Sequence, residues 1–314
     1  MSVALTLPRI ESSPAASGVS YGAPVRLCDE VRAACAGLAG SARFVSIDLD
    51  RIGSIEPGPG PALDPEHHHL EGSNAEVAAF LLTLDAVNFG SGWFPTLRKR
   101  PGMSGYFTVA AALTDRFRAD GAWSAAELRG LDRRSVAHTF GQDERHPLMP
   151  LYAEALRDLG RFLGGREPLA VVQAAEGSAE RFAETLARGM RFFDDRGFYK
   201  RAQITASDMA LGGVAHFSDL DRLTIFADNL VPHVLRVDGV LRYDPRLAER
   251  IDAGELLPPG EEETEIRACA VHACELVASE AGVAARTLDG WLWNRGQAPR
   301  YKARPRHRTR TVYY

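Results

Sequence analysis

The sequence of 314 residues lacks several features that would place it at once in a known class. Its four cysteines form no CxxC pair, so a zinc site has no support, and buried free thiols in a reducing compartment are expected instead. No stretch approaches the roughly 20 apolar residues that a membrane span needs. The first residues also lack an apolar core of signal-peptide length. These absences predict a cytoplasmic protein with no membrane partner.

The chain has no excess of positive charge. It carries 37 Lys and Arg against 41 Asp and Glu, for a formal net charge of -4 at pH 7. Because binding to a nucleic-acid backbone needs a basic field, we expect no direct nucleic-acid partner.

Glycine-rich nucleotide motifs and strand patterns are scarce as well. No G-x-x-x-x-G-K, G-x-G-x-x-G or G-x-S-x-G sequence opens a helix after a strand, which counts against triphosphate-, dinucleotide- and hydrolase-type sites. Residues 44–49 are consistent with one short strand, and residues 237–240 with a small hairpin turn. Composition alone therefore predicts a helical domain and no particular reaction.

Helical signals fill most of the remaining sequence. Ser73 with Glu76, and Ser124 with Glu127, form capping-box patterns. Residues 148–163 and 261–278 carry apolar residues at helical spacing. We predict a mainly α fold: a loose N-terminal arm at residues 1–20, then a single helical domain at 21–314 that can divide into two lobes around a cleft.

A loop rich in proline and glycine at residues 57–65 precedes three adjacent histidines, His67 to His69. Three consecutive side chains on a helix cannot all face one ion, so the histidines do not indicate a metal site. We expect no bound metal in this protein.

Two segments combine carboxylates with aromatic or basic residues. Asp85, Asn88 and Phe89 share one helix face, which suits a planar base, although an ordinary helix end stopped by a glycine has the same pattern. Lys200 and Asp208 belong to a second such helix. A solvated face is the alternative interpretation of its Lys-Arg pair.

Two further segments carry isolated charge. Asp228 lies in an apolar stretch shortly before a proline, as either a helix cap or a partly desolvated carboxylate. The basic segment 304–310, followed by Tyr313 and Tyr314, is either a solvated tail or an anion site.

Together these segments resemble the queuosine salvage protein family, in the family's order and from about residue 75 onward. The Tyr-Lys-Arg-Ala-Gln-Ile and Phe-Ala-Asp blocks are specific. The sequence departs from the family at Asn229, where tyrosine is common, and in the loop 90–93. The matching blocks are Asp85-x-x-Asn88-Phe89, Ser104-Gly105-Tyr106, Phe198-Tyr199-Lys200-Arg201-Ala202-Gln203-Ile204, Phe226-Ala227-Asp228, Glu265-Ile266-Arg267-x-Cys269 and His307-Arg308-x-Arg310-x-x-Tyr313-Tyr314.

The resemblance implies an N-glycosyl hydrolase that releases queuine from queuosine 5'-phosphate for salvage into tRNA modification. It also implies an all-helical fold similar to DNA glycosylases, with Lys200 and Asp228 in catalysis and a small-molecule substrate. We expect a monomer that needs no cofactor. The alternatives are a non-catalytic protein that binds a modified nucleoside or tRNA, and a DNA-repair glycosylase.

The chemistry of this substrate suggests partners for each of its parts. A carboxylate, Asp85 or Asp208, suits the N–H donors of the guanine-like edge, and aromatic rings suit the base plane. Cations suit the phosphate. The expected substrate contacts are Asp85, Asn88, Phe89, Trp93, Tyr106, Asp208, Phe226, Arg267, His307, Arg308 and Arg310.

Overall fold

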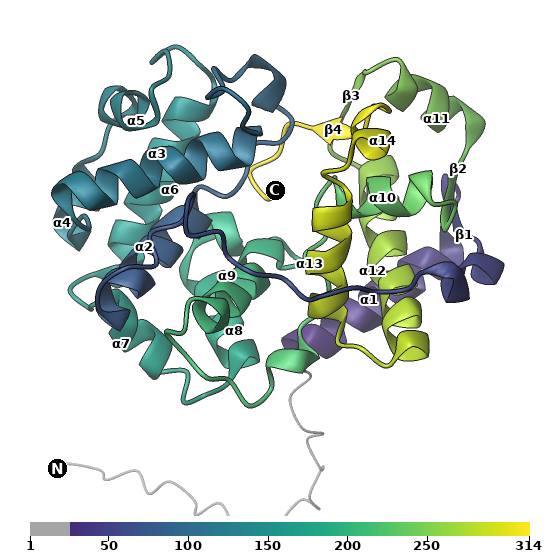
Figure 1. Ribbon diagram of the computed structural model, residues 1–314, viewed down its shortest axis with the longest axis horizontal. Helices are drawn as coiled ribbons and strands as arrows, with labels where there is room; N and C mark the ends of the chain where they lie inside the picture. Colours follow the sequence, from purple (N-terminus) through teal and green to yellow (C-terminus); the bar gives the residue numbers. More distant parts are fainter. Residues whose placement is uncertain (1–25) are drawn as a thin grey trace, which may run out of the picture.

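A computed structural model describes residues 26–314, so the expected arm at residues 1–20 lies outside the described part (Figure 1). Helices dominate this part of the chain, which confirms the prediction of a mainly α fold. Among the described residues no single helix is long and apolar enough to cross a membrane. One pair, α12 with α13, passes that test only when joined, and it is bent by 109°.

Two groups of helices stand side by side in Figure 1. The first lobe is continuous in sequence, on the left of the view. It contains α2 (Asn74–Ala86), η2 (Phe94–Thr96), α3 (Gly105–Asp120), α4 (Ala125–Gly130), α5 (Arg133–Phe140), α6 (Leu148–Leu163), α7 (Pro168–Gln173), α8 (Ala179–Gly189), η3 (Arg191–Phe193) and α9 (Lys200–Leu211).

The second lobe combines the start of the described chain with its end. Its first helix packs along α12, although more than half of the chain separates them. It contains α1 (Leu27–Ser41), β1 (Val45–Ile47), η1 (Leu49–Ser54), η4 (Leu220–Arg222), α10 (Val231–Val237), β2 (Leu241–Tyr243), α11 (Pro245–Asp252), β3 (Leu256–Leu257), α12 (Glu261–Ala281), α13 (Ala285–Arg295), α14 (Pro299–Lys302) and β4 (Arg308–Thr309).

Local capping chemistry explains where several helices begin. Both predicted capping boxes are present, because each serine side chain accepts from the backbone N–H three residues on and each glutamate accepts from the serine N–H. Helix α6 has the predicted bounds, and α12 begins where its acidic run meets the positive end of the helix dipole.

The short strands support the helices rather than forming a layer. Strand β1 lies inside the predicted segment and pairs antiparallel with β2, Val45 opposite Tyr243. The predicted hairpin at residues 237–240 is wrong. Helix α10 begins at Val231, with Pro232 in its first turn, and runs to Val237; Gly239, at φ 82°, then turns the chain into β2.

The four cysteines lie on two helices that pack together, α1 and α12. Cys28 and Cys35 come from α1, Cys269 and Cys274 come from α12, and all four are buried free thiols, as predicted. Burial raises the pKa of the Cys35 thiol to about 12, so it stays protonated and unreactive.

Candidate active site

The predicted site residues come from both lobes and meet along their boundary. Asp85 and Asn88 lie at the end of α2, and Lys200 opens α9 in the same lobe. Asp228 lies in an extended segment, residues 223–229, of the second lobe. Helix α13 runs along the boundary between the two lobes in Figure 1.

Buried side chains hold the backbone of the extended segment, which has no helix or strand to pair its polar groups. The Thr224 N–H donates to Gln203 Oε1 at 2.9 Å. Farther along, Arg267 Nε donates to the Ala227 carbonyl at 3.0 Å. Since buried backbone groups need partners, these bonds fix the path of the chain into Asp228.

Asp228 caps helix α10 with one carboxylate oxygen, and its other oxygen accepts no hydrogen bond from residues 26–314. Its Oδ1 accepts from the N–H of Leu230 at 2.7 Å and of Val231 at 3.1 Å, where α10 begins. Within residues 26–314, no donor lies in hydrogen-bond range of Oδ2. The residue is partly exposed, so a ligand can reach this oxygen.

Lys200 lies buried between the carboxylates of the two lobes. Its side chain donates to the Asn88 carbonyl at 3.4 Å. Burial lowers the pKa of Lys200, while the charges of Asp228 and Asp85 oppose that shift. The residue before it, Tyr199, has a left-handed backbone with φ 50°, which costs energy in a residue other than glycine and sets the start of α9.

Asp85 and Asp208 form a buried carboxyl pair on the first lobe. Burial raises the pKa of Asp85 to about 6, although a hydrogen bond from Asn88 and the charge of Lys200 act the other way. Burial, then the charge of Asp85, raises the pKa of Asp208 well above its usual range. Two such groups hold at least one proton between them near neutral pH. The pair can therefore both donate and accept hydrogen bonds.

The aromatic side chains predicted for the site are of two kinds. Tyr106 is partly exposed; its hydroxyl bonds with His68 Nε2 at 2.9 Å, and its ring lies 5.9 Å from that of Trp293. Phe89 and Trp93 are buried, at 1% and 8% exposure, so their rings belong to the hydrophobic core. The rings open to a ligand are those of Tyr106 and Trp293.

The Lys-Arg pair at the start of α9 is not on a solvated face. Arg201 is 1% exposed and donates to the Ala86 carbonyl at 2.8 Å and the Val312 carbonyl at 2.7 Å. Its guanidinium also lies 4.8 Å from the Phe89 ring centroid. Arg201 therefore joins α2, α9 and the last residues of the chain.

Arg267 is likewise committed to protein contacts. It is 3% exposed, and its guanidinium pairs with Asp195 at 3.1 and 2.5 Å between the rings of Phe198 and Tyr314. Burial alone would lower the pKa of Arg267, but the charge of Asp195 raises it above its usual value. A phosphate could reach this cation only by displacing Asp195.

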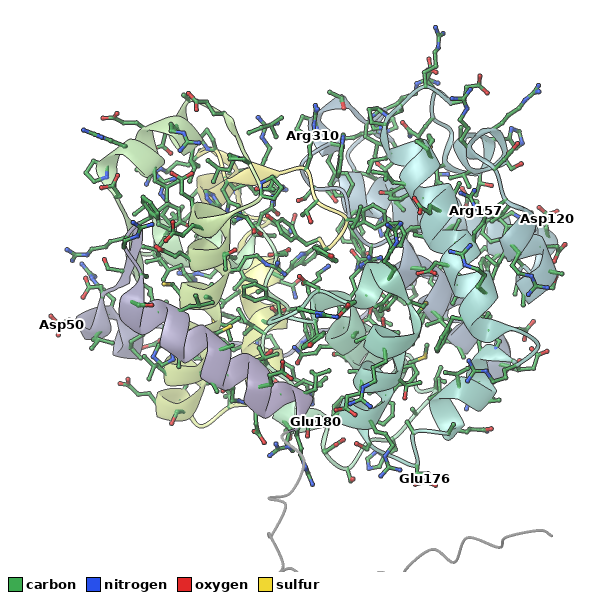
Figure 2. All side chains as sticks on the ribbon, turned by 180° about the vertical axis from the view of Figure 1, so that it is seen from behind. Asp50, Asp120, Arg157, Glu176, Glu180 and Arg310 are labelled. Atoms are coloured by element: carbon green, nitrogen blue, oxygen red, sulfur yellow. The ribbon has the colours of Figure 1, made fainter. Side chains whose placement is uncertain are left out.

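The basic segment 304–310 contains side chains that are buried or hydrogen-bonded and others that are exposed and unpaired within the described chain. His307 is 1% exposed; burial, then the charge of Arg267, lowers its pKa to about 3, so it is neutral at neutral pH. Arg308 donates to the Gly254 carbonyl at 2.5 Å. Arg306 and Arg310 are exposed and make no ion pair or hydrogen bond within the described chain. Figure 2 labels Arg310 beside the segment that passes between the lobes.

Arg306 lies beside the predicted catalytic carboxylate. The side-chain amide of Asn229 donates to the backbone carbonyl of His307 at 3.1 Å, which places residues 306 and 307 against 228 and 229. Desolvation lowers the pKa of Arg306, and the charge of Asp228 opposes that shift.

One carboxylate of this region was not among the predicted residues. Asp289 on α13 is 6% exposed, and its Oδ1 accepts from the backbone N–H of Phe226 at 2.8 Å. The predicted residue Phe226 is itself 5% exposed, with its ring in the core. The available sequence signal was an acidic residue within an apolar helical stretch, 288–292, which is also typical of a solvated position.

The helical fold and this cluster define a mainly α protein with a buried lysine among carboxylates. The sequence matches the family described as queuosine salvage protein over residues 68–314. The chain belongs to the queuosine salvage protein family, as its motifs predicted.

Curated relatives named Queuosine 5'-phosphate N-glycosylase/hydrolase are similar to the chain. One from Sphaerobacter thermophilus is 34% identical over 306 residues, which cover 87% of this chain and 94% of the relative. One from Mus musculus is 28% identical and covers 79% of this chain and 85% of the relative. One from Dictyostelium discoideum is 40% identical over a shorter match, 37% of this chain and 40% of the relative.

Proposed function

We propose that this protein hydrolyses the N-glycosidic bond of queuosine 5'-phosphate and releases queuine. The names of its relatives support this activity. The observation that carries it is the buried Lys200 among carboxylates, one of which, Asp228, keeps an oxygen free of protein donors within residues 26–314. A protein that only binds the nucleoside has no evident need for such a group.

Cleavage of the bond develops positive charge on C1' and the ring oxygen of the ribose. A fixed carboxylate beside that carbon stabilises the charge or orients the attacking water. Asp228 serves in this role through Oδ2, since Oδ1 is held by the start of α10. Lys200 is the cation beside this carboxylate: burial lowers the pKa of Lys200, and the charge of Asp228 opposes that shift.

The carboxyl pair Asp85 and Asp208 binds the edge of the base. Oδ2 of Asp85 is buried and has no partner within the described chain, so it can accept an N–H donor of queuine. Asn88 is partly exposed beside it. A ring stacked on the base contributes roughly 1–3 kcal/mol, and Tyr106 is the exposed candidate, with Phe89 and Trp93 packed in the core.

The phosphate lies nearest the exposed arginines of the basic segment. Arg306 is the first candidate because it is unpaired in the described chain and lies near Asp228, which the ribose must approach. Arg310 remains the second. The committed contacts of Arg267, His307 and Arg308 make them supports of this segment rather than direct phosphate ligands.

Replacing Asp228 by Asn tests the proposal. The amide oxygen can still cap α10, so the fold and queuine binding should remain, while turnover should fall at least ~100-fold, or about 2.7 kcal/mol. Free queuine is assayed after incubation with queuosine, its 5'-phosphate and intact tRNA, with queuine affinity measured by calorimetry.

Three outcomes would contradict the proposal. Near wild-type turnover of Asp228→Asn would leave Asp228 as a cap only. Binding without any release of queuine by the wild type would indicate a non-catalytic binder. Release only from intact tRNA would contradict a nucleotide substrate.

A further inference from the structure

Asp289 is a buried carboxyl group that the roles given above leave without a function. Helix α13, which carries it, packs closely against the 57–65 loop. The distance is so short at the next residue, Gly290, that an added Cβ would lie 2.3 Å from the Pro61 side chain. One oxygen of Asp289 accepts the N–H of Phe226 at 2.8 Å, two residues before Asp228. The carboxyl group is therefore fixed beside the catalytic segment.

Charged and titratable groups from three elements face this carboxyl. Asp228 comes from the extended segment, Lys200 and Asp208 from α9, and Cys274 from α12. Burial, then the charge of Asp228, raises the pKa of Asp289 to about 7, while the Phe226 hydrogen bond and Lys200 act against the shift. Asp228, by contrast, accepts two backbone N–H bonds at Oδ1, and within residues 26–314 its Oδ2 has no protein donor.

The reaction needs a proton on the leaving base. When the bond between C1' and the base nitrogen breaks, its electron pair leaves with the base. Queuine is a 7-deazapurine and has no N7 to be protonated, so the proton must reach the base at another position. Two carboxyl groups held in opposite protonation states divide such work, one as the acid and one as the stabilising anion.

We propose that Asp289 is the acid that donates this proton while Asp228 stabilises the charge on C1'. The inference rests on the proposed function. The C1'–N bond breaks and its electron pair stays on the ring nitrogen, that nitrogen takes the proton of Asp289, and water adds its hydroxyl to C1'. The second proton of that water returns to Asp289, so the cycle consumes one water and needs no other reactant.

The test is Asp289→Asn, assayed as queuine release from queuosine 5'-phosphate between pH 5.5 and 9. The amide oxygen keeps the Phe226 hydrogen bond, but the side chain can no longer donate an acidic proton. We expect kcat at pH 6 to fall about 100-fold or more, the usual contribution of general acid catalysis, with queuine affinity unchanged.

The pH profile separates an acid from a structural group. An acid acts in its protonated form, so wild-type kcat should fall about tenfold per pH unit above the pKa of Asp289, and the variant should lack this fall. Asp221→Asn is the matched control, because Asp221 is an exposed carboxylate that pairs at 2.9 Å with Arg286 of α13, the helix that carries Asp289. It should keep the wild-type rate and profile.

Several results would overturn the assignment. One is a wild-type kcat that stays constant from pH 6 to 9. This measurement uses only the wild type, so it does not depend on whether a variant folds. Another is an Asp289→Asn variant with near wild-type kcat, or one whose loss is in queuine affinity. In each case Asp228→Asn would still abolish queuine release, so the proposed function would stand. If the wild type releases no queuine, the proposed function itself is contradicted.

Discussion

The buried arginines of α9 and α12 and two exposed arginines of the basic segment 304–310 differ in whether their guanidinium groups are free to bind a ligand. Arg201 and Arg267 are buried, and their guanidinium groups contact carbonyls, a carboxylate and aromatic rings. Arg306 and Arg310 are exposed and free of partners within residues 26–314. Conspicuous motif arginines can thus build the framework, while an arginine outside the most specific blocks stays available to bind an anion.

Arg267→Ala should show the largest effect. It leaves Asp195 as a buried charge without its partner, a change that typically costs about 3–5 kcal/mol. The unfolding free energy, measured with denaturant, should fall by that amount. A stable Arg267→Ala variant that loses only its preference for the 5'-phosphate would remove the distinction between framework and open arginines, and would make Arg267 a phosphate ligand.

Asp85→Asn tests the buried carboxyls of the same framework through pH. Because the folded-state pKa of Asp85 is raised to about 6, its contribution to stability is complete below about pH 4 and is lost as pH rises through 6. The wild type should lose about 1–3 kcal/mol relative to the variant between pH 4 and 7. Melting temperatures across this range measure the effect, and parallel curves would contradict it.

Arg306→Ala tests whether an exposed arginine of the basic segment binds the phosphate. Removing an exposed, partly screened cation should raise KM for queuosine 5'-phosphate about tenfold, near 1.4 kcal/mol, and leave KM for queuosine unchanged. The difference should shrink as salt is added. If Arg310→Ala alone produces this loss, the phosphate lies at Arg310.

Arg304→Ala is the matched control and should have the smallest effect. This arginine is exposed and pairs with Asp252 at 3.3 Å, so its removal should change stability by no more than about 0.5 kcal/mol. Its phosphate preference should equal that of the wild type. An effect as large as that of Arg306→Ala would indicate general attraction by the basic segment rather than a specific contact.

Local features of the fold were predictable from the sequence, and long-range pairings were not. The box of Ser73 and Glu76 forms within four residues, so its pattern alone locates the start of α2. Arg267 meets Asp195 across 72 residues, and no periodicity indicates that partner. The family resemblance supplied Lys200 and Asp228, but only the packing of α13 brought Asp289 beside them.

The order of the lobes in the chain has a consequence for biosynthesis. The first lobe is one continuous stretch, so all of its helices have been made once α9 has left the ribosome. Helix α1 is made earlier but packs against α12, so its apolar residues, from Leu27 to Cys35, wait until residue 281 has emerged. A nascent chain truncated before α12 should therefore expose this helix to chaperones, even with the first lobe complete.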